Sequence, residues 1–146
     1  MIRHRHLTHR FVELLPDRLD PGVLYVSMEY GTIAHSCCCG CGTDVYTPLT
    51  PTDWSMTYDG DAVSLHPSVG NWHQPCRSHY VVRKGKVIEA GPWSDEQIAT
   101  ERERDRAAKA RHYGAGPPET TPTAPKAPVK PTGLLARLKK RVARWF

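Results

Sequence analysis

Apolar and polar residues alternate along several short segments of this chain, which is the pattern of half-buried β-strands. Residues 23–28 are rich in β-branched and aromatic side chains, and residues 32–34 continue the pattern after Gly31. Further strands are expected at residues 44–49, 54–58, 62–65, 80–83 and 86–89. Glycine-containing turns separate the later segments, so these are predicted to pair as antiparallel hairpins. The pattern therefore predicts a mainly β domain.

A helix is expected after the last hairpin. Ser94 and Gln97 have the spacing of a capping box, in which the two side chains satisfy backbone N–H groups of the first helical turn. Ile98 is almost the only large apolar residue that follows, so residues 94–113 are predicted to form a polar, solvated helix. Residues 114–133 contain six prolines and few large side chains, which is typical of an extended linker.

The last residues, 134–146, place leucine, valine, tryptophan and phenylalanine at helical spacing and carry five basic side chains and no acidic one. This composition is typical of a short amphipathic helix that folds on a membrane surface or on an acidic partner protein. Residues 1–112 carry 13 basic and 14 acidic side chains. Because the basic excess lies outside the β domain, the charge pattern argues against a nucleic-acid partner.

The expected organisation is therefore a small antiparallel β domain with zinc-ribbon-like hairpins, followed by polar segments. The predicted parts are an N-terminal arm at 1–20, a zinc-binding β domain at 21–93, a polar helix at 94–113, a Pro-rich linker at 114–133 and a basic amphipathic tail at 134–146. The N-terminal arm is rich in arginine and histidine, and we expect it to be a frayed, solvated end.

The cysteines carry the zinc prediction, because all five of them lie in two short clusters. Crowded thiols beside glycines are typical of a tetrahedral zinc site. Their odd number, their adjacent positions and the lack of an apolar N-terminal run argue against disulfides. The spacing leaves open which four of six candidates bind the metal, since both a CxxC pair and an alternating CxCxC series are present. The six candidates are Cys37, Cys38, Cys39, Cys41, Cys76 and His79.

Several motifs give residues 31–92 a resemblance to a family of small, largely bacterial proteins, domain of unknown function 6527. These motifs are CCCGCG at 37–42, where the family typically has CPCGCG, then Trp54, LHPSVGNW at 65–72 and PCRSHY at 75–80. Cys38 stands where the family has proline. The resemblance therefore implies that the metal-ligand candidates are Cys37, Cys39, Cys41, Cys76 and His79. It also implies a metal-binding domain that occurs beside bacterial ubiquitin-like conjugation genes.

The sequence favours a binding or adaptor module with structural Zn²⁺ over an enzyme, because thiolate-rich zinc sites are usually structural. The expected partner is a protein, such as a ubiquitin-like protein or its conjugation enzymes. Ser68, Asn71 and Trp72 form a candidate binding loop, and no residue is assigned a catalytic role. The alternative is a zinc-dependent hydrolase or transferase with an open metal position, in which His79 or His73 moves protons. The expected location is the cytoplasm, with contact between the tail and the inner membrane face left open.

Overall fold

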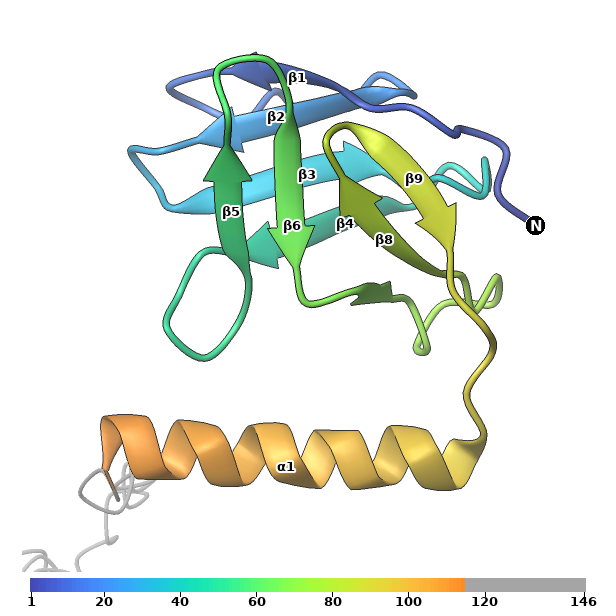
Figure 1. The fold of residues 1–146 in the computed structure, drawn as a ribbon, viewed down its shortest axis with the longest axis vertical. Helices are drawn as coiled ribbons and strands as arrows, with labels where there is room; N and C mark the ends of the chain where they lie inside the picture. The colour runs from blue at the N-terminus through green and yellow to red at the C-terminus, as the bar shows by residue number, and fades with distance from the viewer. Residues whose placement is uncertain (115–146) are drawn as a thin grey trace, which may run out of the picture. The chain divides into compact units, whose positions relative to one another are not determined.

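The computed structural model of the protein describes residues 1–114, and the tail and all but the first residue of the predicted linker lie outside them. Within this range the chain is mainly β, as predicted, and one helix follows the strands (Figure 1). The elements are β1 (Thr8–Phe11), β2 (Val23–Ser27), β3 (Thr32–Ser36), β4 (Asp44–Pro48), β5 (Ser55–Tyr58), β6 (Val63–His66), β7 (Val69–Gly70), β8 (His79–Arg83), β9 (Lys86–Glu89) and α1 (Asp95–Tyr113).

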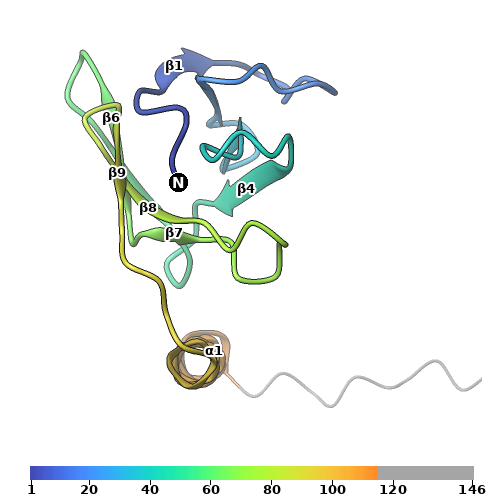
Figure 2. The same cartoon turned by 90° about the vertical axis from the view of Figure 1, so that its right-hand side faces the viewer.

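The strands form two facing layers. One layer is a four-stranded sheet in the order β1-β2-β3-β4, and the other contains the β5-β6 hairpin and the β7-β8-β9 sheet (Figure 2). β4 shows why the sequence pattern predicts these strands, because Val45 and Thr47 are buried whereas Asp44 and Tyr46 are exposed. The main hydrophobic core lies between the layers, where Leu24, Val26 and Ile33 of one layer share a cluster with Val63, Tyr80 and Val82 of the other.

The first residues differ from the expected frayed arm. Ile2 and Leu7 are buried in the main core, and β1 pairs with β2 in parallel. The backbone N–H groups of Arg3 and His4 both donate to the carbonyl of Cys38, at 2.9 Å. The arm is therefore part of the domain, because two isolated apolar side chains and a set of backbone hydrogen bonds hold an otherwise polar segment.

The helix α1 begins at the predicted capping box, with Ser94 Oγ accepting from Gln97 N at 3.2 Å and Gln97 Oε1 accepting from Ser94 N at 2.8 Å. Ile98 is the one buried residue of the helix. Two ion pairs connect the helix to the β domain, Arg77 with Asp95 at 2.9 Å and Lys109 with Asp53 at 3.0 Å. No helix within residues 1–114 is both long enough and apolar enough to cross a bilayer.

Candidate catalytic and metal-binding sites

Four of the five cysteines come together at one corner of the β domain. The sulfurs of Cys37, Cys39, Cys41 and Cys76 all lie within 4.8 Å of one another, and all the cysteines of the chain are free. Cys37 Sγ lies 3.4 Å from Cys39 Sγ and 3.9 Å from Cys76 Sγ. A tetrahedron of sulfurs about 2.3 Å from a zinc ion has edges of about 3.8 Å, so these four side chains fit such an ion.

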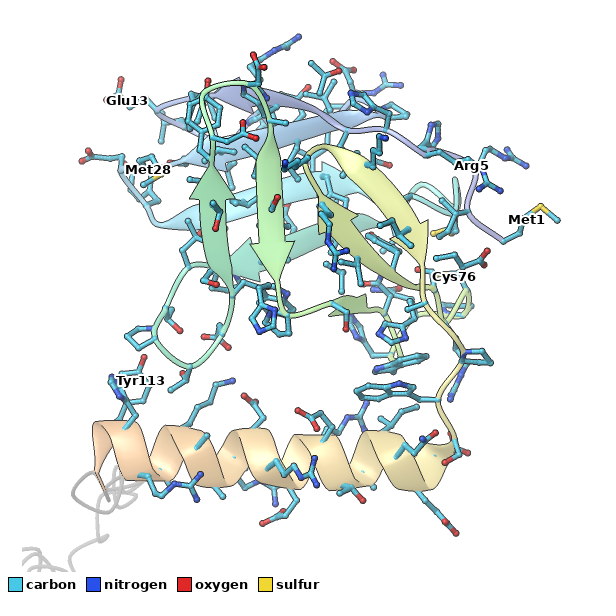
Figure 3. The ribbon with its side chains drawn as sticks, viewed as in Figure 1. Met1, Arg5, Glu13, Met28, Cys76 and Tyr113 are labelled. Atoms are coloured by element: carbon cyan, nitrogen blue, oxygen red, sulfur yellow. The ribbon has the colours of Figure 1, made fainter. Side chains whose placement is uncertain are left out.

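Two loops build this cluster. In the loop after β3, Cys37 N donates to Thr43 O at 2.8 Å, and Gly40 and Gly42 adopt positive φ angles that let the chain turn around the sulfurs. The loop between β7 and β8 supplies Cys76 (Figure 3). The next residue, Arg77, has a φ of 44°, which is a strained conformation for a residue with a side chain.

In the absence of a cation, Cys37 and Cys39 favour the neutral thiol form. Burial raises the pKa of the Cys37 thiol, and burial together with the neighbouring thiols raises the pKa of Cys39 to about 12. By contrast, a hydrogen bond with the Thr43 hydroxyl lowers the pKa of the Cys41 thiol to about 6. Crowded thiols of this kind become thiolates together only when a metal compensates their charge.

Cys38 lies outside the cluster and is fully buried in the hydrophobic core. Burial raises the pKa of its thiol to about 12, so it behaves as a small apolar side chain. Nearby, the buried His35 has its pKa lowered by burial to about 4, and its Nε2 lies 2.7 Å from the Tyr80 hydroxyl. The sulfurs that the fold brings together are thus those of the alternating series, Cys37, Cys39 and Cys41, with Cys76.

His79, the fifth predicted ligand, is not part of this cluster. It is the first residue of β8 and is 8% exposed. Its Nε2 lies 2.8 Å from Ser68 Oγ, and its Nδ1 lies 2.8 Å from the carbonyl oxygen of Gly91. A carbonyl only accepts hydrogen bonds, so Nδ1 carries a proton, and in the neutral imidazole Nε2 then presents its lone pair to the Ser68 hydroxyl. This is the orientation that a histidine needs to accept a proton from a serine.

Ser68 lies between β6 and β7, directly after a cis peptide bond that joins His66 to Pro67. It is half-buried and lines a groove of about 310 Å³ together with His79. Three tryptophans and several helix residues form the other walls. The lining residues are Thr52, Asp53, Trp54, Pro67, Gly70, Trp72, Trp93, Glu101, Asp105 and Lys109.

Asn71, the remaining residue of the predicted binding loop, points away from this groove into the protein. Its Nδ2 donates to Ser78 Oγ at 2.9 Å, and Ser78 Oγ lies 3.1 Å from Cys37 Sγ. Ser78 thus connects the thiol cluster to the strand that begins with His79. Sequence reasoning did not find Gly91 or Trp93, since a backbone carbonyl carries no residue signature and Trp93 lies in a loop after the last strand.

A protein-family model, BubE, described as the bacterial ubiquitination-like system serine protease, matches residues 11–90, which is more than half of the chain. The matched range contains Ser68, His79 and all five cysteines. The name BubE differs from the family name that the sequence motifs indicate, domain of unknown function 6527. The description of the model nevertheless confirms the bacterial ubiquitin-like context that the resemblance implies. No curated protein and no solved structure matches the chain.

Proposed function

The chain belongs to the BubE family, and from this membership and the geometry of its groove we propose that it is a serine peptidase of a bacterial ubiquitination-like system. One observation carries the proposal. Ser68 Oγ lies 2.8 Å from His79 Nε2, while His79 Nδ1 lies 2.8 Å from Gly91 O, and both side chains line a groove of about 310 Å³. Nucleophile, base and a third group that orients the base are the three parts of an activated serine.

The reaction follows from this arrangement. Ser68 Oγ attacks the scissile carbonyl while His79 Nε2 takes the hydroxyl proton, and the Gly91 carbonyl holds the imidazole through Nδ1. His79 then gives this proton to the leaving amine as the C–N bond breaks, which leaves an acyl group on Ser68. His79 then takes a proton from the water that attacks the acyl carbon and returns it to Ser68 Oγ as the ester C–O bond breaks, which releases the carboxylate and regenerates the serine. The proposed substrate is an amide bond at the end of a ubiquitin-like protein, in its precursor or in a conjugate.

The thiol cluster is proposed to hold a structural Zn²⁺. Four sulfur ligands close the coordination shell and reduce the Lewis acidity of the ion, so the centre stabilises the two loops and takes no part in the reaction. This assignment keeps the zinc module expected from the sequence and adds catalysis at a separate place. The cytoplasmic location stays a prediction.

The test compares the full chain with Ser68→Ala and His79→Ala in reaction with a fluorophosphonate, a reagent that labels activated serines. We expect Ser68→Ala to abolish labelling and His79→Ala to slow it by at least about 10³-fold, because the serine is then no longer activated. Ser55→Ala is the matched control, since Ser55 is an exposed serine on β5 outside the groove, and it should label like the parent.

Cleavage of a fusion between the ubiquitin-like protein and a reporter should depend on the same two residues. If Ser68→Ala cleaved the fusion at the parental rate, the peptidase proposal would be wrong. If cleavage by that variant also stopped on metal removal, the zinc-dependent hydrolase would take its place. If neither labelling nor cleavage occurred in the parent while it bound the ubiquitin-like protein, the adaptor module would be favoured.

A further inference from the structure

The strand that follows Ser68 has an unpaired edge within residues 1–114. β7 pairs with β8 alone, with Gly70 opposite His79. Asn71 N donates to Ser78 O at 2.8 Å, so Asn71 and Ser78 form a hydrogen-bonded pair. In an antiparallel ladder, the pair next to a hydrogen-bonded pair is a non-hydrogen-bonded one. The pair of Gly70 and His79 is therefore of this kind, and the N–H and C=O of Gly70 point away from β8. Gly70 also lines the groove together with Ser68, so the strand edge that carries this N–H belongs to the groove residue set.

The indole of Trp72 lies against the same residue. A Cβ at position 70 would lie 2.4 Å from Trp72 Nε1, so only glycine allows the indole N–H to approach the strand this closely. Neighbours hold the ring in place: Trp93 stacks on it with centroids 5.5 Å apart, and the His79 ring lies at 4.9 Å. The guanidinium of Arg77 lies 5.9 Å from the ring centroid. The Trp72 ring is therefore held with its indole nitrogen against Gly70, and it lines the same groove as Ser68 and His79.

We propose that Trp72 Nε1–H, together with the backbone N–H of Gly70, stabilises the oxyanion formed when Ser68 attacks a carbonyl. The inference rests on the proposed function. In the attack, the Oγ–C bond forms, the carbonyl π-electrons move to the oxygen, and the serine proton moves to His79 Nε2. The negative oxygen then needs donors that are fixed before the reaction, and an indole N–H beside a backbone N–H supplies two of them. Both come from the segment just after the nucleophile.

The test uses the full chain and a rhodamine-tagged fluorophosphonate, whose phosphoryl oxygen takes the place of the oxyanion. Trp72→Phe keeps an aromatic ring in the stack and removes the N–H. We expect its second-order labelling rate constant to fall about 10²- to 10³-fold, as for loss of one oxyanion donor. The fall should be the same at every pH, because the Ser68–His79 hydrogen bond is unchanged.

Trp93→Phe is the matched control, because it removes the same ring area from the same stack and leaves the Trp72 N–H in place. The fall in its labelling rate constant should be at least about tenfold smaller than the fall in Trp72→Phe. Gly70→Ala is a second test, since its Cβ would push the indole away, and it should slow labelling as much as Trp72→Phe. Thermal melting of each variant measures any change in fold.

Labelling of Trp72→Phe within about threefold of the parental rate would overturn the inference, as would an equal loss in Trp93→Phe. A shifted midpoint in the pH profile of Trp72→Phe would also overturn it, because the ring would then act by positioning His79. Labelling of Ser68→Ala at the parental rate is a different result. It would refute the peptidase itself.

Discussion

Ser78 links the two candidate sites at the level of a single side chain. Its Oγ accepts a hydrogen bond from Asn71 Nδ2 at 2.9 Å, so its own proton is free to be donated to a sulfur. Cys37 Sγ lies 3.1 Å and Cys76 Sγ 3.5 Å from that oxygen. Hydrogen bonds from outside the coordination shell stabilise the thiolate form and fix the direction of the ligand.

Ser78→Ala should therefore bind zinc about 10- to 100-fold more weakly, as other substitutions around metal ligands do. Competition with a chromophoric chelator measures this affinity, and Ser55→Ala on the exposed side of β5 is the control. Equal affinities in parent and Ser78→Ala would show that the hydroxyl does not support the metal centre.

Cys38 and Cys41 provide a matched pair for the ligand assignment. Cys41 belongs to the cluster of four sulfurs, whereas Cys38 is buried in the core. Cys41→Ala should lose stoichiometric zinc, because three protein ligands hold the ion far less tightly than four. Cys38→Ala should keep it and lose only about 1 kcal/mol of folding stability from the small cavity. Metal analysis of both purified proteins decides the point, and a zinc-free Cys38→Ala would contradict the assignment.

At the residue scale, the sequence reveals the cysteines but not the environment of His79. A CxxH spacing suits a metal ligand as well as it suits a histidine with another role, so the spacing leaves both readings open. Ser68 directly precedes β7 and His79 is the first residue of β8, so their contact depends on the pairing of these two strands. Gly91 contributes through its backbone, which no sequence pattern shows.

At the scale of elements, α1 depends on very few contacts with the β domain. Its one buried side chain, Ile98, is 5% exposed, and its other contacts include two ion pairs on the surface. Surface ion pairs contribute little to stability, whereas removing a buried isoleucine side chain costs about 2–5 kcal/mol. Ile98→Ala should therefore release the helix while the strands stay folded.

Amide hydrogen exchange measures this release directly. Protection should fall in residues 95–113 and persist in the strands of both layers, because the core between the layers contains no helix residue. Ala99→Gly, at an exposed position of the same turn, measures the loss of helix propensity alone. Equal protection of the helix in Ile98→Ala and parent would show that the ion pairs are sufficient.

The C-terminal half of α1 should respond to acid through Asp53. The Thr50 hydroxyl, which donates at 2.6 Å, and then Lys109 hold the pKa of Asp53 below its ordinary value. A depressed folded-state pKa gives stability that is present above the ordinary pKa of about 4 and is lost as pH falls through the folded value. Because both side chains are partly exposed, the contribution should be below about 1 kcal/mol.

Asp53→Asn should lower the exchange protection of residues 105–113 at pH 7 and remove the part of its acid dependence that lies below pH of about 4. Asp44→Asn is the control, since this carboxylate lies on β4 away from Lys109. The interpretation fails if Asp53→Asn and parent show the same dependence on pH.

The strands that could be predicted from the sequence are those with a period of two and a clear turn beside them, such as β4 and the β8–β9 hairpin. β1 could not be predicted, because its parallel pairing with β2 is set by the burial of Ile2 and Leu7 at the ends of a polar segment. β7 has two residues and exists only through its register with β8. Such elements follow from the fold and have no pattern of their own.

At the scale of the whole molecule, one short segment joins the proposed metal centre to the proposed catalytic pair, Ser68 and His79. Cys76 belongs to the thiol cluster, Ser78 contacts it, and His79 opens β8 as the proposed base. Loss of the ion should therefore free the loop that leads into β8, and the position of His79 should become less defined. The two facing layers retain their own core, so we expect loosening of this corner before unfolding of the whole domain.

Removal of zinc with a strong chelator should lower the melting temperature by about 10 °C or more, since an ion at a hundredfold excess over its dissociation constant stabilises a protein by about 2.7 kcal/mol. At a temperature where the metal-free protein is still folded by circular dichroism, fluorophosphonate labelling of Ser68 should also slow. Without the ion, the loop that leads into β8 no longer fixes the position of His79. Readdition of zinc should restore both. If labelling stayed at the parental rate in protein shown to contain no metal, the thiol cluster and the Ser68–His79 pair would be independent. The contacts of Ser78 would then contribute to stability alone.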